Sequence, residues 1–192
     1  MGILTFDRGI HPEYHKELTF GKRIEPAALP KTVIIPLLQH AGAPCEPLVK
    51  KGDAVVEGQK IGDVKAFISA PVHASISGKV KDIELAHHPV GVRTLSIIIE
   101  GDGSVKQWLV NEREGHALSE SLNSLSPDAI REKVREAGIV GMGGAGFPSS
   151  VKLQPPKGVT IDTVILNGCE CEPYLTADHR LMVEEPAKVV WG

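Results

Sequence analysis

Two short segments in the last third of the sequence carry the residue types best suited to chemistry. The first is GMGGAGFP, residues 141–148, with four glycines in six positions. Glycine lacks a Cβ atom, so such a loop lets backbone approach a ligand closely and adopt positive φ. Its amides can form an anion-binding concavity, especially before a helix start such as Pro148. The segment is therefore either a ligand-binding loop or a glycine-rich turn between domains.

The context of the loop excludes the common nucleotide motifs. A Walker loop needs Gly-Lys followed by Ser or Thr, and this loop has neither. The element predicted before it is a helix, whereas a dinucleotide-binding glycine motif follows a strand. Lys152, four residues after Pro148, can add positive charge near a phosphate or an electron-rich ring.

The second segment is NGCECEP, residues 167–173, which follows an apolar run. Ligands of α/β folds bind at the carboxyl ends of strands, and Asn167 can donate to and accept from a heterocyclic edge. Glu170 and Glu172 are costly to bury without a purpose. Cys169 and Cys171 could ligate a metal, but four ligands are needed and no CxxC exists, so we interpret them as small, partly buried residues at a strand end.

The elements that position these segments follow an α/β pattern. Ser126 and Pro127 predict a helix start, Ile130, Val134 and Ala137 give it an apolar face, and Gly138 can end it. Residues 159–168 predict a buried strand. Residues 176–185 predict a further helix with Thr176 as its cap.

The first half of the chain predicts a different architecture. Residues 1–30 have no period and are interpreted as an extended lead-in, and residues 31–110 indicate short strands separated by turns. Residues 111–125 are polar and form the best linker candidate. We therefore predict a mixed α+β chain: a β module at 31–110 and the start of an α/β domain at 126–192.

Composition excludes several functional classes. The 192 residues include 21 basic and 24 acidic side chains, so the chain lacks the basic surplus of a nucleic-acid binder. Three cysteines are too few for a disulfide scaffold, and the start lacks a signal-peptide pattern. No apolar run approaches the ~20 residues of a membrane span. We expect a soluble chain and no nucleic-acid partner.

The β module resembles the barrel-sandwich fold of biotinyl and lipoyl carrier domains. Its turns are marked by VKKGD, VEGQ and SGKV, and Lys65 is the only lysine between Gly62 and Ala70. Because the residues around Lys65 differ from the carrier motifs, we favour a docking or scaffolding module over a carrier. The adjacent His87 and His88 suggest a metal weakly; for them and for His40 and His73 the simpler interpretation is a hydrogen bond to backbone.

Both halves also resemble known electron-transfer proteins. GMGGAGFPSSVKL and NGCECEPYLTADHRLM resemble the flavin-binding subunit family of respiratory complex I, whose glycine loop and acidic segment cradle FMN beside the NADH site. RGIHPEYHKELT, IIPLLQHAGAPCEPLVKKGD and FISAPVHASISGKV resemble the N-terminal module of the RnfC family. The resemblance implies a barrel-sandwich hybrid module followed by the start of an FMN-binding domain.

The resemblance also implies the site residues by position. It implies no catalytic acid or base and no metal ligand. The residues implied along the flavin, its phosphate and the nucleotide pocket are Gly141, Gly143, Gly144, Ala145, Gly146, Phe147, Lys152, Asn167, Cys169, Glu170 and Glu172. Two positions depart from complex I, where Met142 is an arginine and Cys169 is an aspartate.

For function, the resemblance implies an electron-transfer subunit of an ion-translocating ferredoxin:NAD oxidoreductase, the Rnf complex. Such a peripheral subunit on the cytoplasmic side of the membrane passes electrons between NAD(H), FMN and iron–sulfur clusters, with ferredoxin and other Rnf subunits as partners. The resemblance implies that the rest of the flavin domain, with half of its pocket, and the 4Fe-4S clusters lie C-terminal to this chain, so we expect residues 1–192 alone to be inactive. The alternatives are a flavin-dependent cobalamin reductase and a non-catalytic carrier or assembly module.

Overall fold

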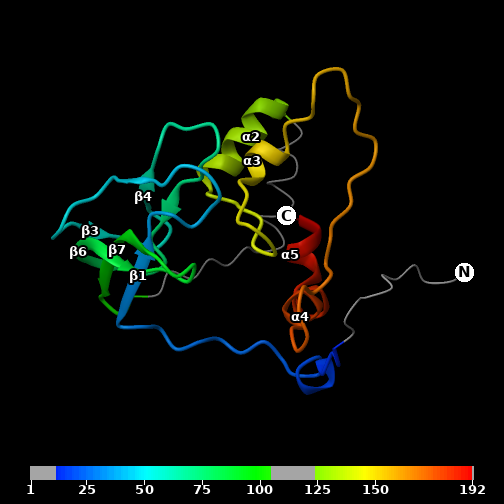
Figure 1. The fold of residues 1–192 in the computed structure, drawn as a ribbon, viewed down its shortest axis with the longest axis horizontal. Helices are drawn as coiled ribbons and strands as arrows, with labels where there is room; N and C mark the ends of the chain where they lie inside the picture. The colour runs from blue at the N-terminus through cyan, green and yellow to red at the C-terminus, as the bar shows by residue number, and fades with distance from the viewer. Residues whose placement is uncertain (1–11, 105–123, 192) are drawn as a thin grey trace, which may run out of the picture. The chain divides into compact units, whose positions relative to one another are not determined.

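The computed structural model describes residues 12–104 and 124–191 (Figure 1). Nearly all of the linker proposed at 111–125 lies outside these residues. Contacts divide the chain into two compact units. The larger unit contains residues 28–162, and the smaller combines 1–27 with 163–192. The domain boundaries proposed from the sequence stay predictions.

The β-rich part of the larger unit consists of two antiparallel sheets. The four-stranded sheet has the order β1 (Thr32–Pro36), β7 (Arg93–Gly101), β6 (Gly78–His87) and β3 (Ala54–Val55). The three-stranded sheet has the order β2 (Glu46–Pro47), β4 (Lys60–Asp63) and β5 (Val72–His73). The predicted all-β character of residues 31–110 is confirmed where the structure describes them. The two longest strands differ from the short strands that the turn residues predicted, since β6 has ten residues and β7 has nine.

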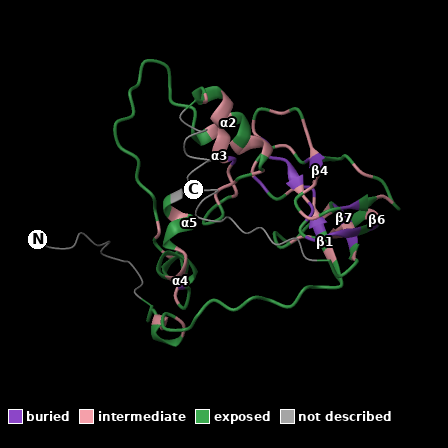
Figure 2. Cartoon of the chain, turned by 180° about the vertical axis from the view of Figure 1, so that it is seen from behind, coloured by how far each residue is buried: buried purple, intermediate pink, exposed green. Residues whose placement is uncertain are grey.

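The core of this unit lies between the strands. Ile61, Ile97 and Ile99 have no exposed surface, and Figure 2 shows the buried residues gathered on the strands. Along the start of β6, Gly78 and Val80 are buried whereas Lys79 and Lys81 are exposed. Because side chains alternate across a strand, this pattern directs one face of β6 into the core.

The helices begin and end close to the predicted positions. They are α2 (Pro127–Glu136), α3 (Ser149–Lys152), α4 (Ala177–Glu184) and α5 (Pro186–Trp191), with a 3₁₀ turn η1 (Lys16–Leu18) in the lead-in. Ser126 caps α2 by accepting a hydrogen bond from the Ala129 amide at 3.2 Å. Gly138, at φ 69°, lies just beyond that helix as predicted.

The buried strand predicted at 159–168 is wrong. These residues form no strand, and Val164 and Ile165 are 90% and 85% exposed. A strand of a buried parallel sheet needs neighbours to pair with its backbone and cover its side chains. Every strand pairing among the described residues joins strands between 32 and 101, so the apolar run has no sheet to enter.

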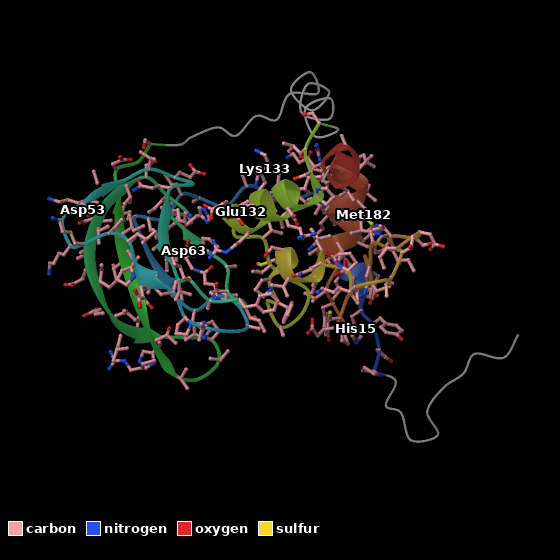
Figure 3. All side chains as sticks on the ribbon, turned by 90° about the horizontal axis from the view of Figure 1, so that it is seen from above. His15, Asp53, Asp63, Glu132, Lys133 and Met182 are labelled. Atoms are coloured by element: carbon pink, nitrogen blue, oxygen red, sulfur yellow. The ribbon has the colours of Figure 1, made fainter. Side chains whose placement is uncertain are left out.

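Helix α2 is fixed to the β module by an ion-pair cluster. The Arg135 guanidinium donates to both carboxylate oxygens of Asp63, at 2.8 and 3.5 Å, and to the Val64 carbonyl at 3.2 Å. Lys60 pairs with Asp63 at 3.4 Å and also with Glu136. Figure 3 shows Asp63 on the side of the strands that faces α2.

The backbone beyond α2 also approaches the β module. A Cβ atom at Gly138 would lie 2.5 Å from the Pro71 carbonyl oxygen, so only glycine fits there. The cluster and this close approach together fix where α2 ends and where the glycine loop begins.

We expect Arg135→Met to lower the free energy of unfolding by ~1–2 kcal/mol at pH 7, because the bidentate pair is only partly exposed. Burial alone would favour neutral Asp63, but the hydrogen bonds from Arg135 and Val64 outweigh it and hold the pKa of Asp63 below its usual value. The stabilisation is therefore present above the unfolded-state pKa, near 4, and is lost as the pH falls through the folded value.

Urea unfolding of the chain and the variant at pH 7 and at about pH 3 measures both effects. Arg131→Met is the matched control, because the ion pair that Arg131 makes within the described residues is with Asp128 of its own helix. Two results would contradict the assignment. One is an equal loss of unfolding free energy in Arg135→Met and Arg131→Met, and the other is a loss in Arg135→Met that is as large at about pH 3 as at pH 7.

Candidate functional site

The glycine loop is closed on itself by backbone hydrogen bonds. A bridge joins Val140 to Pro148, and the Gly141 amide donates to the Phe147 carbonyl at 3.0 Å. The Gly144 and Gly146 amides donate to the Gly141 carbonyl at 3.3 and 3.2 Å. These three amides are therefore already used within the loop. The sequence suggested a concavity of free amides that binds an anion. The loop instead presents a bare backbone surface to a ligand.

That bare surface is centred on Gly143 and Gly144. A Cβ atom at either position would meet no atom within 4 Å, so the space beside the backbone is open. Met142 is 88% exposed next to them, and Phe147 is half-buried. The arrangement allows a flat ligand to lie directly against the peptide planes.

Lys152, at the last position of α3, places its charge beside the loop. Its Nζ atom lies 2.9 Å from where a Cβ atom of Gly141 would be. The ammonium group therefore lies close to the loop backbone, as expected for a residue that pairs with an anionic ligand group.

The far end of the loop is tied to the β module. The Ala41 amide donates to the Gly146 carbonyl at 3.0 Å. Gly146 has φ 64°, and its Cβ atom would lie 3.1 Å from the Gln39 carbonyl oxygen. The loop is thus held at both ends, by Gly138 against Pro71 and by Gly146 against the residues after β1.

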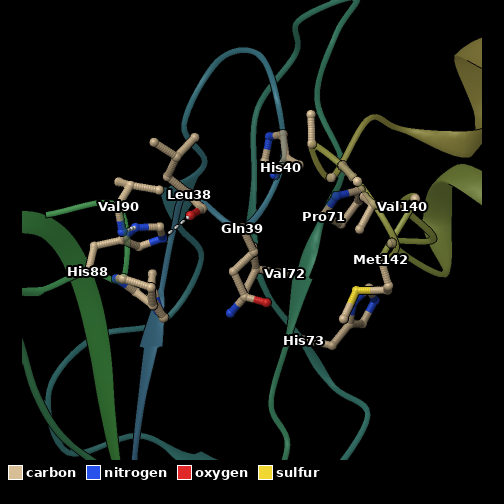
Figure 4. Close-up of a pocket in the computed structure, with 18 residues that line it drawn as sticks. Leu38, Gln39, His40, Pro71, Val72, His73, His88, Val90, Val140 and Met142 are labelled. Carbon is tan, nitrogen blue, oxygen red and sulfur yellow. Dashed lines mark hydrogen bonds between the residues drawn. The ribbon is translucent and has the colours of Figure 1, made fainter. Parts of the chain in front are cut away.

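A cavity of about 730 Å³ lies between the loop and the β module (Figure 4). The loop contributes Gly141, Met142, Gly144, Ala145 and Gly146. The β module contributes an apolar wall and four polar side chains, which are Gln39, His40, His73 and His88.

Two of the three histidines that line the cavity hydrogen-bond to backbone carbonyls, as the sequence analysis predicts. His40 Nε2 bonds the Ala43 carbonyl at 2.9 Å, and His88 Nε2 bonds the Leu38 carbonyl at 2.9 Å. His88 Nδ1 also accepts from the Val90 amide, which makes Nε2 its protonated nitrogen. No group of acidic, His or Cys side chains in the described parts of the chain has the geometry of a metal site.

Gln39 and His73 are the cavity residues that sequence reasoning missed as site candidates. Neither side chain forms a hydrogen bond within the described residues, and Figure 4 shows the Gln39 amide projecting into the cavity. The sequence suggests only a strand histidine at position 73. Its place beside the loop depends on the docking of α2, which has no signature in the sequence.

The acidic segment, residues 167–173, belongs to the smaller unit, whereas the glycine loop, residues 141–148, belongs to the larger one. Asn167 Oδ1 accepts from the Cys169 amide at 2.9 Å, and a Glu170 carboxylate oxygen accepts from the His179 amide at 3.0 Å. Cys169 and Cys171 are exposed, which corrects the interpretation of partly buried thiols. Glu172 is exposed as well.

These features define a class of protein: a module of two antiparallel sheets docked on an open glycine loop with a lysine beside it. Residues 4–104 match the RnfC barrel sandwich hybrid domain, and residues 134–192 match the Nuo51 FMN-binding domain. The chain belongs to the RnfC family.

Curated relatives agree with this assignment. The C subunit of the Na(+)-translocating ferredoxin:NAD(+) oxidoreductase complex of Acetobacterium woodii is 48% identical over 200 residues, covering 98% of this chain and 41% of the relative. The corresponding proton-translocating relative of Clostridium ljungdahlii is 49% identical over 99% of this chain and 40% of its own length. The C subunit of the ion-translocating oxidoreductase complex of Rhodobacter capsulatus is 42% identical over 96% and 35%. The chain therefore spans about two fifths of the first two relatives and about a third of the last.

The residues of the larger unit fit FMN. The open side of Gly143 and Gly144 suits a planar ring, Gly144 also lines the cavity of about 730 Å³, and Lys152 places a cation beside Gly141. Ala145 and Gly146 continue the same surface towards the β module.

We expect alanine at Gly144 and Gly146 to have different effects on folding. Gly144→Ala should change the free energy of unfolding by less than about 1 kcal/mol, because its side is open and its φ is not positive. Gly146→Ala should lower it by about 1–2 kcal/mol, because an alanine there is both strained and crowded. Urea unfolding measures the two changes; equal losses would show that the loop is not held as described.

Proposed function

We propose that the chain is the barrel-sandwich module and the first part of the FMN-binding domain of an RnfC-type subunit of an ion-translocating ferredoxin:NAD(+) oxidoreductase complex. The observation that carries the proposal is the bare glycine loop with Lys152 beside it, which lies in the segment that matches the FMN-binding domain. The names of the relatives support the electron-transfer role.

Within this proposal the protein binds and orients the cofactor. Gly141, Gly143, Gly144, Ala145 and Gly146 would lie along FMN, and Lys152 would hold a negative group. Bound FMN would supply the chemistry, since it accepts two electrons from NADH and can release them one at a time. Asn167, Cys169, Glu170 and Glu172 would line the polar edge and the nucleotide pocket, and Phe147 would flank the nicotinamide.

The remaining parts of the electron path are proposed for the whole protein. NAD(H) would be the hydride donor or acceptor, and iron–sulfur clusters outside residues 1–192 would connect FMN with ferredoxin and with other subunits of the complex. The subunit would be peripheral, on the cytoplasmic side of the membrane. No described helix has the length and hydropathy of a membrane span.

A carrier function is not favoured. Lys65 lies in the loop of residues 64–71 between β4 and β5, not at a two-residue hairpin tip. Ser69 Oγ in that loop donates to the carbonyls of Val64 and Ala66 at 3.2 and 2.9 Å, which folds the loop back on itself. An adduct on Lys65 in the intact mass of the protein would reverse this conclusion.

Titration of the chain into FMN, followed by flavin fluorescence, tests the proposal. We expect saturable quenching that Gly144→Asp abolishes, because the new carboxylate fills the open side of the loop and repels the phosphate. Ala28→Asp is the control, since it adds the same charge at an exposed residue of the larger unit that does not line the cavity. Circular dichroism verifies that all three proteins fold. No quenching, from this chain and from a chain of the relatives' full length, would refute the flavin site.

A further inference from the structure

Residues 14–24 of the lead-in pack against residues 172–184 within the smaller unit. The Tyr174 amide donates to the Tyr14 carbonyl at 2.7 Å, and Thr19 Oγ1 donates to the Tyr174 carbonyl at 2.9 Å. Lys16 Nζ donates to the Leu175 carbonyl at 2.9 Å and to the Glu172 carbonyl at 3.4 Å. Both backbone polar groups of Tyr174 are thus satisfied by residues more than 150 positions earlier.

The turn at Tyr174, which these hydrogen bonds hold, has an unfavourable backbone conformation. Tyr174 has φ 68° and His15 has φ 48°, and they are the only non-glycine residues with positive φ in the described chain. Their rings stack, with centroids 5.0 Å apart and planes inclined by 22°. A bulky residue keeps a left-handed conformation only where its surroundings impose it, and such strain gathers at functional sites. Here the lead-in supplies those surroundings.

The contacts serve the turn and not the neighbouring helix. Thr176 precedes α4, and the sequence predicts it as the cap, but its side chain makes no capping hydrogen bond. Its buried hydroxyl bonds Thr19 Oγ1 at 2.9 Å instead. Lys16 places a cation near the N-terminus of α4, where the helix dipole disfavours positive charge. Thr176 is thus linked to the lead-in through Thr19, and Lys16 to the backbone just before α4.

A second set of contacts extends the packing along α4. Arg180 donates to the Phe20 carbonyl at 2.9 Å, and the Ile24 amide donates to the Glu184 carboxylate at 3.1 Å. Arg180 also pairs with Glu184 on the same helix. The lead-in is thus anchored independently of the turn, so that losing one contact at Lys16 or Thr19 need not release it.

We propose that Lys16 and Thr19 are positioning residues for the acidic segment, setting the direction of the backbone that carries Glu170 and Glu172. The inference rests on the proposed function, in which those two residues line the flavin and nucleotide pocket. Lys16 holds the carbonyl of Glu172 itself, and Thr19 holds the residue two positions later. In this view the lead-in supports two residues of the proposed site from within the smaller unit, although the β module lies between them in the sequence.

The test uses the full-length protein loaded with FMN and compares Lys16→Met, Thr19→Val and Thr19→Ser. We expect Lys16→Met and Thr19→Val each to weaken FMN binding, by at most about tenfold, because the backbone that carries Glu170 and Glu172 loses a hydrogen bond that fixes its direction. At saturating FMN we expect the visible absorption bands of the bound flavin to shift. Thr19→Ser, which keeps the hydroxyl, should restore both properties.

Lys22→Met is the matched control, because Lys22 is an exposed lysine of the same lead-in whose side chain makes no hydrogen bond or ion pair within the described residues. Thermal unfolding of every variant separates positioning from folding. If Lys16→Met does not fold, the Thr19 pair carries the test, since valine and threonine have the same shape.

The three ways in which the test can fail are distinguishable. Unchanged FMN affinity and spectrum in folded Lys16→Met and Thr19→Val overturn the inference while the flavin site stands. A loss of thermal stability with an unshifted spectrum also overturns it, because the contacts would then be structural only. If the unsubstituted protein binds no FMN, the proposed function fails, and the inference fails with it.

Discussion

The larger unit depends on the attachment of α2 to the β module. Asp63, Arg135, Lys60 and Glu136 form one cluster of alternating charge, in which each ion lies beside an opposite one. Partly exposed ion pairs contribute little stability individually, but a bidentate pair fixes orientation. Gly138 follows directly, and its lack of a Cβ atom allows the chain beyond the helix to lie against the Pro71 carbonyl. Because the glycine loop follows α2 directly, this attachment also sets the position of the loop.

This attachment gives the β module a role beyond that of a separate domain. It closes one side of the cavity in front of the loop and directs Gln39 and His73 towards it. The loop has used the amides of Gly141, Gly144 and Gly146 internally, so it relies on an open backbone face and on Lys152 to meet a ligand. The open backbone side of Gly143 and Gly144 can select a ligand by its shape, and the positive charge of Lys152 favours an anionic one. That combination suits a flat, phosphorylated cofactor.

The lead-in plays a comparable part in the smaller unit. Within its described residues, from position 12 onward, the lead-in forms only the short turn η1, and its side chains and carbonyls satisfy the backbone around Tyr174. Two left-handed aromatic residues persist there because they stack and because four hydrogen bonds from the lead-in surround them. The chain thus uses residues distant in sequence to hold a strained turn that local propensity would not form.

The sequence by itself determined the local features. Ser126, Pro127 and Gly138 set the ends of α2, alternation and turn residues produced the short strands, and the motifs identified the family. These signals act over a few residues, so they can be read without a fold. Tertiary structure decided the rest. Residues 159–168 had the composition of a buried strand but found no neighbouring strand. Thr176 makes no capping hydrogen bond and donates to Thr19 of the lead-in. His73 lies beside the end of α2 only because that helix docks at Asp63. Each outcome depends on a partner far along the chain, and such partners leave no local pattern.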